Sequence, residues 1–270
     1  MLKASGRTVR GGAGDEMLVD TALVAAGGAV TALPVLVILV LAGMAPATAS
    51  WPFIAASSVI QVGYFGLVAA AYRSGDMSLA YPIMRGAAPL LTVSFGRLVL
   101  GEAPSALALV GILATSAGVL GMAAGRHGAA DRRSIVAALA NAVVIATYTV
   151  IDGIGARRSG SPMAYTMAIF VAAAVMFVPL VARRHGGALR AAVRERWWMA
   201  LIGGSCVTLS YGLALWAMTR APVATVAALR ESSIVFAMIL AAVVLREKIG
   251  FARVAGGGLI VVGAVALRLG

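Results

Sequence analysis

Residues 85–120 read RGAAPLLTVSFGRLVLGEAPSALALVGILATSAGVL, and residues 230–265 read RESSIVFAMILAAVVLREKIGFARVAGGGLIVVGAV. The second stretch follows the first at a constant offset of 145 positions (85 to 230), and the match extends back to Gly66 without a gap. The matched residues include Arg85 with Arg230, Glu102 with Glu247, Gly111 with Gly256, and Gly118 with Gly263. Apolar residues can coincide by chance, but a buried Arg, a turn Glu and two glycines at one offset indicate an internal duplication.

The composition indicates a membrane protein. Hydrophobic residues make up 61% and charged residues 12% of the chain, whereas soluble domains are about 45–50% apolar and about 25% charged. The formal charge of +12 comes mainly from basic residues in short segments between apolar runs, a pattern of membrane-surface loops that argues against nucleic acid as a partner. Because Cys206 is the single cysteine and His127 and His185 fall between apolar runs, we expect neither a metal site nor a cofactor.

Nine apolar runs are long enough to cross a bilayer, which takes about 20 helical residues. The polar segment before the first run resembles the start of a signal peptide, but the run is too long and lacks a small-residue cleavage site, so we interpret it as a retained helix. The sequence therefore predicts an all-α integral membrane protein, a single bundle of nine transmembrane helices. The runs are 17–43, 52–72, 77–100, 104–125, 133–156, 161–183, 197–219, 222–245 and 250–269.

The duplication relates these runs in pairs. At the same offset, the sixth and seventh runs fall on the first and second, but the partner of the fifth run would precede residue 1. We predict a repeat of five helices, with 1–125 as a first repeat lacking its first helix, through a late start codon or a truncation, and 126–270 as a second, complete repeat. Because five is odd, the copies would cross the membrane in opposite directions. Such an incomplete 5+5 inverted repeat is typical of secondary transporters, whose site lies between the repeats near the midplane.

The basic residues also predict an orientation. Most of the 22 Lys and Arg residues lie on the side of the bundle that holds the N-terminal segment. The positive-inside rule places that side in the cytoplasm and the C-terminus outside. The abundance of Ala, Gly, Val and Arg is typical of a GC-rich bacterial genome, so we expect a multi-pass protein of the bacterial inner (plasma) membrane.

Several segments resemble a known family. The turns LVLGEAP (98–104) and VVLREKI (243–249), together with YRSGDMSLAYPIMRGAAPLL (72–91) and IATYTVIDGIGARRSG (145–160), are similar to the EamA-like family of the drug/metabolite transporter superfamily. The resemblance covers nearly the whole chain from Asp20 on. It implies a ten-helix transporter that exports amino acids, drugs or other metabolites. It also implies that both termini are cytoplasmic, which is opposite to the orientation from the charge count.

Two arginines inside apolar runs, Arg85 and Arg230, are the main candidates for substrate binding. A charge at membrane depth costs roughly 2.5–3.5 kcal/mol on insertion scales and usually faces the protein interior or a cavity. Arg85 follows Tyr81 by four residues on one helix face, and Pro82 and Pro89 would kink that helix and leave carbonyl groups unpaired. Arg85 therefore either lines a cavity with Tyr81 or pairs with a carboxylate and fixes packing.

Glu231 directly follows Arg230 and has three interpretations. It forms a local charge pair with Arg230, it pairs with Arg85 across the repeat interface, or it carries the proton that couples transport to a gradient. Each of these three roles is compatible with a position of Glu231 next to the bound substrate.

The run 133–156 carries a polar stripe on an otherwise apolar helix, which must face protein or water. We predict substrate contacts from Asn141 and Tyr148, whereas Asp152, nearer the helix end, is expected at the membrane interface. Tyr211 and Trp216 either line the same cavity or serve only in packing.

Two acidic residues and the duplicated glycines have structural interpretations. Glu102 and Glu247 are expected to cap or anchor the helix that follows each of them. The glycines allow close helix contact, and they would also suit a seam between two copies of the chain in a homodimer.

These patterns together favour a secondary active transporter, an exporter of a small polar, anionic or zwitterionic metabolite or drug that works by alternating access. Its partners would be that small-molecule substrate and the lipid bilayer. The chain has no GxxxxGK[ST] loop for direct ATP drive. The alternatives are a non-transporting membrane scaffold, an inactive truncated transporter and an integral-membrane enzyme. The sequence disfavours the enzyme because it has no His pair, Asp-rich motif or cluster of intramembrane carboxylates.

Overall fold

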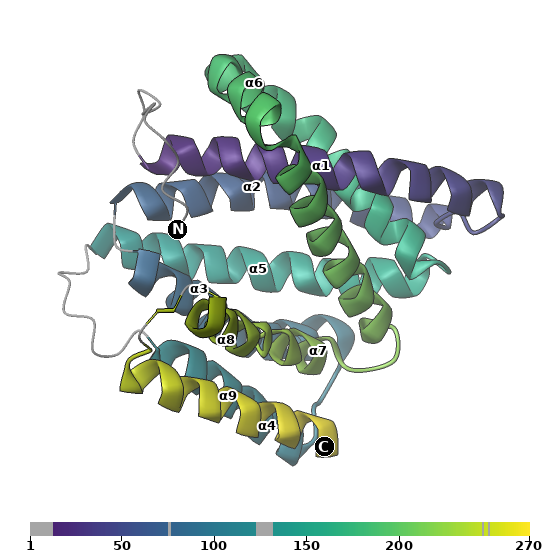
Figure 1. Cartoon of the computed structure of the whole chain (residues 1–270). Coiled ribbons are helices and arrows are strands. Elements are labelled where there is room, and N and C mark those ends of the chain that lie inside the picture. Colours follow the sequence, from purple (N-terminus) through teal and green to yellow (C-terminus); the bar gives the residue numbers. More distant parts are fainter. Residues whose placement is uncertain (1–12, 75–76, 123–131, 245, 248) are drawn as a thin grey trace.

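The computed structural model describes residues 13–74, 77–122, 132–244, 246–247 and 249–270, and all regular structure in these residues is helical (Figure 1). The helices are α1 (Ala13–Leu41), η1 (Thr48–Ser50), α2 (Trp51–Ser74), α3 (Met77–Leu100), α4 (Ala106–Gly121), α5 (Arg132–Arg158), α6 (Pro162–Met218), α7 (Val223–Arg230), α8 (Ser233–Val244) and α9 (Phe251–Leu269).

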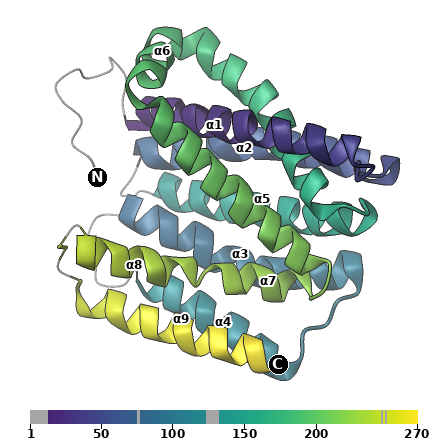
Figure 2. The same ribbon diagram turned by 45° about the vertical axis from the view of Figure 1, so that its right-hand side comes forward.

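The helices lie side by side as a layered bundle. Figures 1 and 2 show α1 and α6 covering one side, α2 and α5 next to them, α3 with α7 and α8 beyond, and α4 with α9 on the opposite side. Large apolar side chains face outward, for example Leu98, Val175 and Phe236, which are 82%, 67% and 71% exposed. Such exposure is unfavourable in water, but it is the normal state of a helix surface in contact with lipid.

Within the described residues, seven stretches are long and apolar enough to cross a membrane. The sequence predicts nine, and two elements account for the difference. α4 has only 16 residues and is a shorter apolar helix, with residues 123–125 of its predicted run outside the described part. α6 is a stretch of 57 residues in which two helices, covering the predicted runs 161–183 and 197–219, join across a kink.

α6 bends where the sequence predicts a connection between two helices. Its backbone leaves helical geometry at His185 (φ −127°, ψ 30°) and at Arg196 (φ −131°, ψ 21°). Residues 186–195 between the two bends are helical instead of forming a loop. After Gly186 and Gly187, this segment consists mainly of Ala, Leu and Arg, which are strong helix formers, so the connection between the two kinks is itself helical.

The predicted run 222–245 is also divided. α7 ends at Arg230 and α8 begins at Ser233, with Glu231 and Ser232 in a turn between them. Serine hydroxyl groups compete with the backbone for hydrogen bonds, and this weakens a helix at such a point. Glu231 lies in this turn and keeps helical backbone angles (φ −67°, ψ −18°).

The turns after α3 and α8 have the same geometry at the offset of the duplication. Gly101 has a φ of 67° and Arg246 a φ of 51°. In the next residue of each turn, the Glu102 N–H bonds to the carbonyl of Gly96 at 3.3 Å and the Glu247 N–H bonds to that of Ala241 at 3.2 Å. A residue in the left-handed region is a common way to end a helix, and here the next residue bonds back to the helix in both turns.

α4 and α9 run antiparallel in close contact. The Ser105 hydroxyl at the start of α4 donates to the carbonyl of Gly270 at the end of α9, at 3.2 Å. A methyl group at Gly118 would lie 2.6 Å from the carbonyl oxygen of Gly256, and one at Gly111 would lie 2.9 Å from that of Gly263. Since Gly111 matches Gly256 and Gly118 matches Gly263 in the duplication, each glycine contacts the counterpart of the other.

Candidate functional site

A cavity of about 640 Å³ lies among α1, α2, α3, α5, α6 and the end of α7. Small-molecule sites in proteins are usually about 300–1,000 Å³. The cavity is lined by residues 17–25 in the first half of α1 and 61–65 in the second half of α2, and by central residues of α5 and α6. It therefore extends from the middle of the bundle toward the end where α1 begins. Asp20 at that end lines the cavity with a side chain that is 53% exposed, so we call it the open end.

Arg85 lines the cavity from α3 and pairs with Glu231 in the turn between α7 and α8. The Arg85 Nε lies 3.1 Å from the Glu231 Oε2, and the two side chains are 20% and 5% exposed. Neither atom meets hydrogen-bond geometry, so the contact is ionic. Of the pairings that the sequence left open for Glu231, the structure contains the one with Arg85.

Arg230 lines the cavity at the end of α7 and has a different environment. Its guanidinium group lies over the ring of Tyr211, 4.8 Å from the ring centre. Among the described residues, no carboxylate lies within 4.0 Å of Arg230. At the offset that relates Arg85 to Arg230, the residue that corresponds to Glu231 is Gly86, which has no carboxylate.

Aromatic side chains form much of the cavity wall. Tyr64, Tyr148 and Tyr211 form a row of edge-on pairs, with ring centres 5.9 Å and 6.4 Å apart. Phe170 continues the row at 6.0 Å from Tyr211. All four line the cavity, and edge-on pairs hold aromatic rings in fixed orientations.

Asp152, for which the sequence predicts a place at the membrane interface, faces the interior of the bundle. The residue is fully buried on α5. Its two carboxylate oxygens accept hydrogen bonds from the hydroxyl groups of Tyr165 at 3.1 Å and Tyr211 at 2.5 Å. Because α5 extends to Arg158, Asp152 lies nearly two turns inside the helix. It fixes Tyr211 from behind the cavity wall.

Half of the predicted substrate-binding residues line the cavity, namely Arg85, Tyr148, Tyr211 and Arg230. Glu231 lies directly behind Arg85.

Three other candidates lie elsewhere. Asn141 is fully buried, and its side-chain nitrogen contacts the sulfur of Met84 at 2.9 Å. Tyr81 is 44% exposed, and Trp216 faces outward beneath Arg220, whose guanidinium lies 4.1 Å from the centre of its ring. These positions do not bring Asn141, Tyr81 or Trp216 to the cavity.

Sequence reasoning missed part of the lining on α2 and α6. Gln61 and Tyr64 lie three positions apart on α2, and Ser210 lies beside Tyr211 on α6. The signal for α2 was present, because a glutamine and a tyrosine on one face of an apolar run form a polar stripe like that on α5. Phe170 gave no signal, since an apolar ring fits packing as well as binding.

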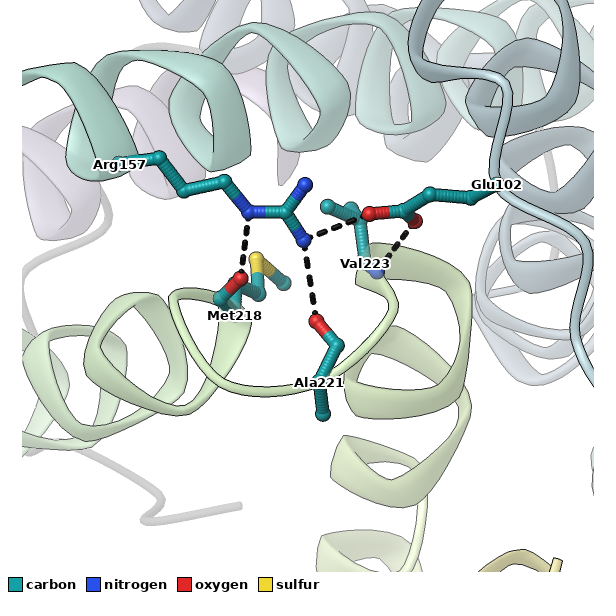
Figure 3. A network of polar contacts seen from close by, with 5 residues as sticks. All are labelled: Glu102, Arg157, Met218, Ala221 and Val223. Atoms are coloured by element: carbon teal, nitrogen blue, oxygen red, sulfur yellow. Dashed lines mark hydrogen bonds and ion pairs between the residues drawn. The ribbon is translucent and has the colours of Figure 1, made fainter.

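A network of polar contacts joins the helices at the opposite end of the bundle, which we call the closed end (Figure 3). Glu102 follows α3, and its Oε1 lies 2.6 Å from the Arg157 Nη2 at the end of α5. The Glu102 Oε2 accepts a hydrogen bond from the Val223 N–H at 2.8 Å, and so caps α7. Arg157 also donates to the carbonyls of Met218 at 2.8 Å and Ala221 at 3.1 Å.

Glu102 therefore does not cap the helix that follows it, and that prediction is wrong. Ser105 caps α4 by accepting a hydrogen bond from the Ala108 N–H at 3.1 Å. Glu102 instead reaches a helix more than a hundred residues further along the chain. The matching Glu247 lies 3.8 Å from Arg253 at the start of α9, where both side chains are partly exposed.

The fold and the site define a multi-pass helical membrane protein with a central cavity that contains aromatic rings and two arginines. The sequence profile of the EamA-like transporter family matches residues 132–269, just over half of the chain. The protein therefore belongs to the EamA-like transporter family, in agreement with the resemblance to the drug/metabolite transporter superfamily. Members of this family are membrane transporters rather than enzymes.

A solved crystal structure has a similar fold. It superposes with a TM-score of 0.71 over 94% of this chain and 87% of that chain, at 20% sequence identity. At this identity the likeness concerns the fold alone. No curated protein matches the sequence significantly.

Proposed function

We propose that the protein is a secondary active transporter of the bacterial inner membrane that exports a small anionic or zwitterionic metabolite or drug by alternating access. The observation that carries this proposal is the central cavity, which opens at one end of the bundle while the Glu102–Arg157 network joins the helices at the other. A site that reaches one end only is what alternating access requires of each of its two end states.

The proposed mechanism depends on inverted repeats in 1–125 and 126–270. Two observations support this division. The turns at Gly101 and Arg246 end their helices in the same way, and the glycines of α4 and α9 contact each other's counterparts in an antiparallel pair. A two-fold axis between the copies would produce such an arrangement, because it places each glycine of one copy against the counterpart of the other glycine.

In export, the solute enters the cavity from the cytoplasm, so we place the open end of this conformation on the cytoplasmic side. The positive-inside rule supports this orientation, because the sequence assigns most basic residues to the side on which the first apolar run begins. Cytoplasmic solute would then enter beside Asp20 and reach the two arginines at mid-depth.

Counterflow in proteoliposomes tests the proposal. Vesicles with purified protein would be loaded with a mixed pool of unlabelled organic acids, amino acids and amines, and radiolabelled members of each class would be added outside in turn. We expect transient, saturable accumulation of at least one anionic or zwitterionic compound and a loss of it in Arg85→Ala and Arg230→Ala. Normal counterflow by both folded variants would remove these residues from the mechanism, and no counterflow by the wild type would favour a non-transporting scaffold.

A further inference from the structure

We infer that the cavity selects organic anions with a single charge and an aromatic body over zwitterions and cations, and that Arg230 binds the anionic group. The inference rests on the proposed function for the view that the cavity is the substrate site. It concerns the charge of the ligand, which the transport proposal leaves open.

The two arginines of the cavity are not equivalent. Arg85 already has a carboxylate partner, since its Nε lies 3.1 Å from the Glu231 Oε2. Arg230 contacts the face of Tyr211, and no carboxylate among the described residues lies within 4.0 Å of it. A guanidinium group presents paired donors that match the two oxygens of a carboxylate. An anionic ligand would therefore supply the missing partner of Arg230.

Among the described residues that line the cavity, no carboxylate lacks a basic partner. Asp20 is the acidic residue in the lining, and its Oδ1 lies 2.8 Å from the Arg196 Nη2. Glu231 lies behind Arg85 and is 4% exposed. Asp152 is fully buried, and each of its carboxylate oxygens accepts a hydrogen bond from a tyrosine hydroxyl group. A ligand ammonium group would lose its hydration without gaining an ionic partner, which is unfavourable.

The walls indicate the rest of the ligand. Tyr64, Tyr148, Tyr211 and Phe170 form a continuous row of rings along the cavity, and Arg230 lies over Tyr211, the third ring of the row. An aromatic body packed along this row would place its acidic group beside Arg230. Aromatic pairs stabilise such an arrangement beyond the apolar area that they bury.

Four compounds with the same phenyl group and different charges test the inference on the detergent-solubilised full chain. They are 3-phenylpropionate (anion), phenylalanine (zwitterion), 2-phenylethylamine (cation) and 3-phenylpropan-1-ol (neutral). Cys206, the single cysteine of the chain, is exposed and lines the cavity. Its rate of alkylation by a maleimide therefore reports occupancy without any transport. We expect 3-phenylpropionate to protect Cys206 at a concentration at least about 10-fold lower than each of the other three compounds.

Variants at Arg230 connect this preference to the residue. Arg230→Gln should remove the preference for the anion, whereas Arg230→Lys should keep part of it, because lysine retains the charge but not the paired donors. Arg220→Gln is the matched control, since Arg220 lies over Trp216 outside the cavity.

Equal or better protection by phenylalanine, or no protection by 3-phenylpropionate, would overturn the inference on the wild type alone, even where a variant does not fold. A preference that persists in Arg230→Gln would overturn the role of Arg230. Protection by the anion without counterflow would instead contradict the proposed transport and leave the charge selectivity standing.

Discussion

The carboxylate of Glu102 bonds to two parts of the bundle at once. One of its oxygens lies 2.6 Å from the Arg157 Nη2 at the end of α5, and the other accepts the Val223 N–H at the start of α7. At the other end of α7, Glu231 pairs with Arg85 of α3. The start of α7 is thus attached to the turn after α3, and the end of α7 is attached to α3 itself. α7 carries Arg230 into the cavity. A movement of α7 would couple the cavity to the closed end.

Glu102→Ala should weaken the closed end. The substitution leaves the Arg157 guanidinium without its carboxylate and the Val223 N–H without its acceptor, a loss of about 1–3 kcal/mol for a hydrogen-bonded charged group. We expect a lower Tm in detergent and faster alkylation of a cysteine introduced at Ala221, measured in a Cys206→Ser background.

Glu247→Ala is the matched control for this prediction. Glu247 occupies the same position in the second copy, but its contact with Arg253 is 3.8 Å long and partly exposed, and exposed ion pairs contribute about 0–1 kcal/mol. The Tm of the Glu247→Ala variant should stay close to that of the wild type. An equal loss of Tm in both variants would show that the effect belongs to the turn geometry rather than to the network.

Gly118→Ala should separate α4 from α9. The added methyl group would lie 2.6 Å from the backbone oxygen of Gly256, so the helices must move apart, and overpacking of this kind costs about 1–3 kcal/mol. Gly121→Ala, on the same helix but with nothing within 4 Å of its added methyl group, should leave the Tm unchanged or raise it slightly. A tolerated Gly118→Ala would mean that the antiparallel contact does not hold the two helices together.

Asp152→Ala should destabilise the protein, because it leaves the buried hydroxyl groups of Tyr165 and Tyr211 without their acceptor. Each unsatisfied buried group costs about 1–3 kcal/mol. Tyr165→Phe combined with Asp152→Ala should lose less stability than the sum of the two single variants, since the second change then removes a group that is already unpaired. Strict additivity of the Tm changes would contradict a direct role of the Asp152–Tyr165 bond.

The sequence was sufficient for the class of fold because apolar runs of membrane length are directly visible in it. It also located the turns at Gly101 and Arg246, since they recur at one offset. The helical connection inside α6 and the turn at Glu231 were not predictable from hydropathy. Hydropathy measures how well a segment fits a lipid environment, and it does not show whether the backbone continues across a polar connection.

The site was predictable only in part for a related reason. Arg85 and Arg230 were identified because a charge in an apolar run requires a partner or a cavity. The cost of burying a polar group does not reveal whether a partner or a cavity meets that cost. Asn141 and Asp152 are also polar residues in an apolar run, but both are buried inside the bundle. Glu102 shows the limit most clearly, because its partners Arg157 and Val223 are distant in sequence.

Glu231→Gln tests whether this residue carries the coupling proton. If it does, the variant should keep counterflow of the substrate but lose the acceleration of transport by an imposed pH gradient, because a glutamine cannot release a proton. Glu195→Gln changes an exposed carboxylate on α6 that does not line the cavity, and this variant should respond to the gradient as the wild type does. Gradient-driven transport that survives in Glu231→Gln would assign coupling to another group.

Cys206 makes the direction of the cavity measurable with the native chain. Because this cysteine lines the cavity and the cavity opens at the end where α1 begins, a membrane-impermeant maleimide should reach it from the cytoplasmic side only. We expect labelling of inside-out vesicles and little labelling of intact spheroplasts. Ala45→Cys in a Cys206→Ser background places a thiol just after the end of α1, at the closed end, where the residue is exposed. It should show the reverse pattern. Labelling of Cys206 from the outside, with Ala45→Cys labelled from the inside, would contradict the proposed orientation. It would show that the cavity of this conformation faces the exterior.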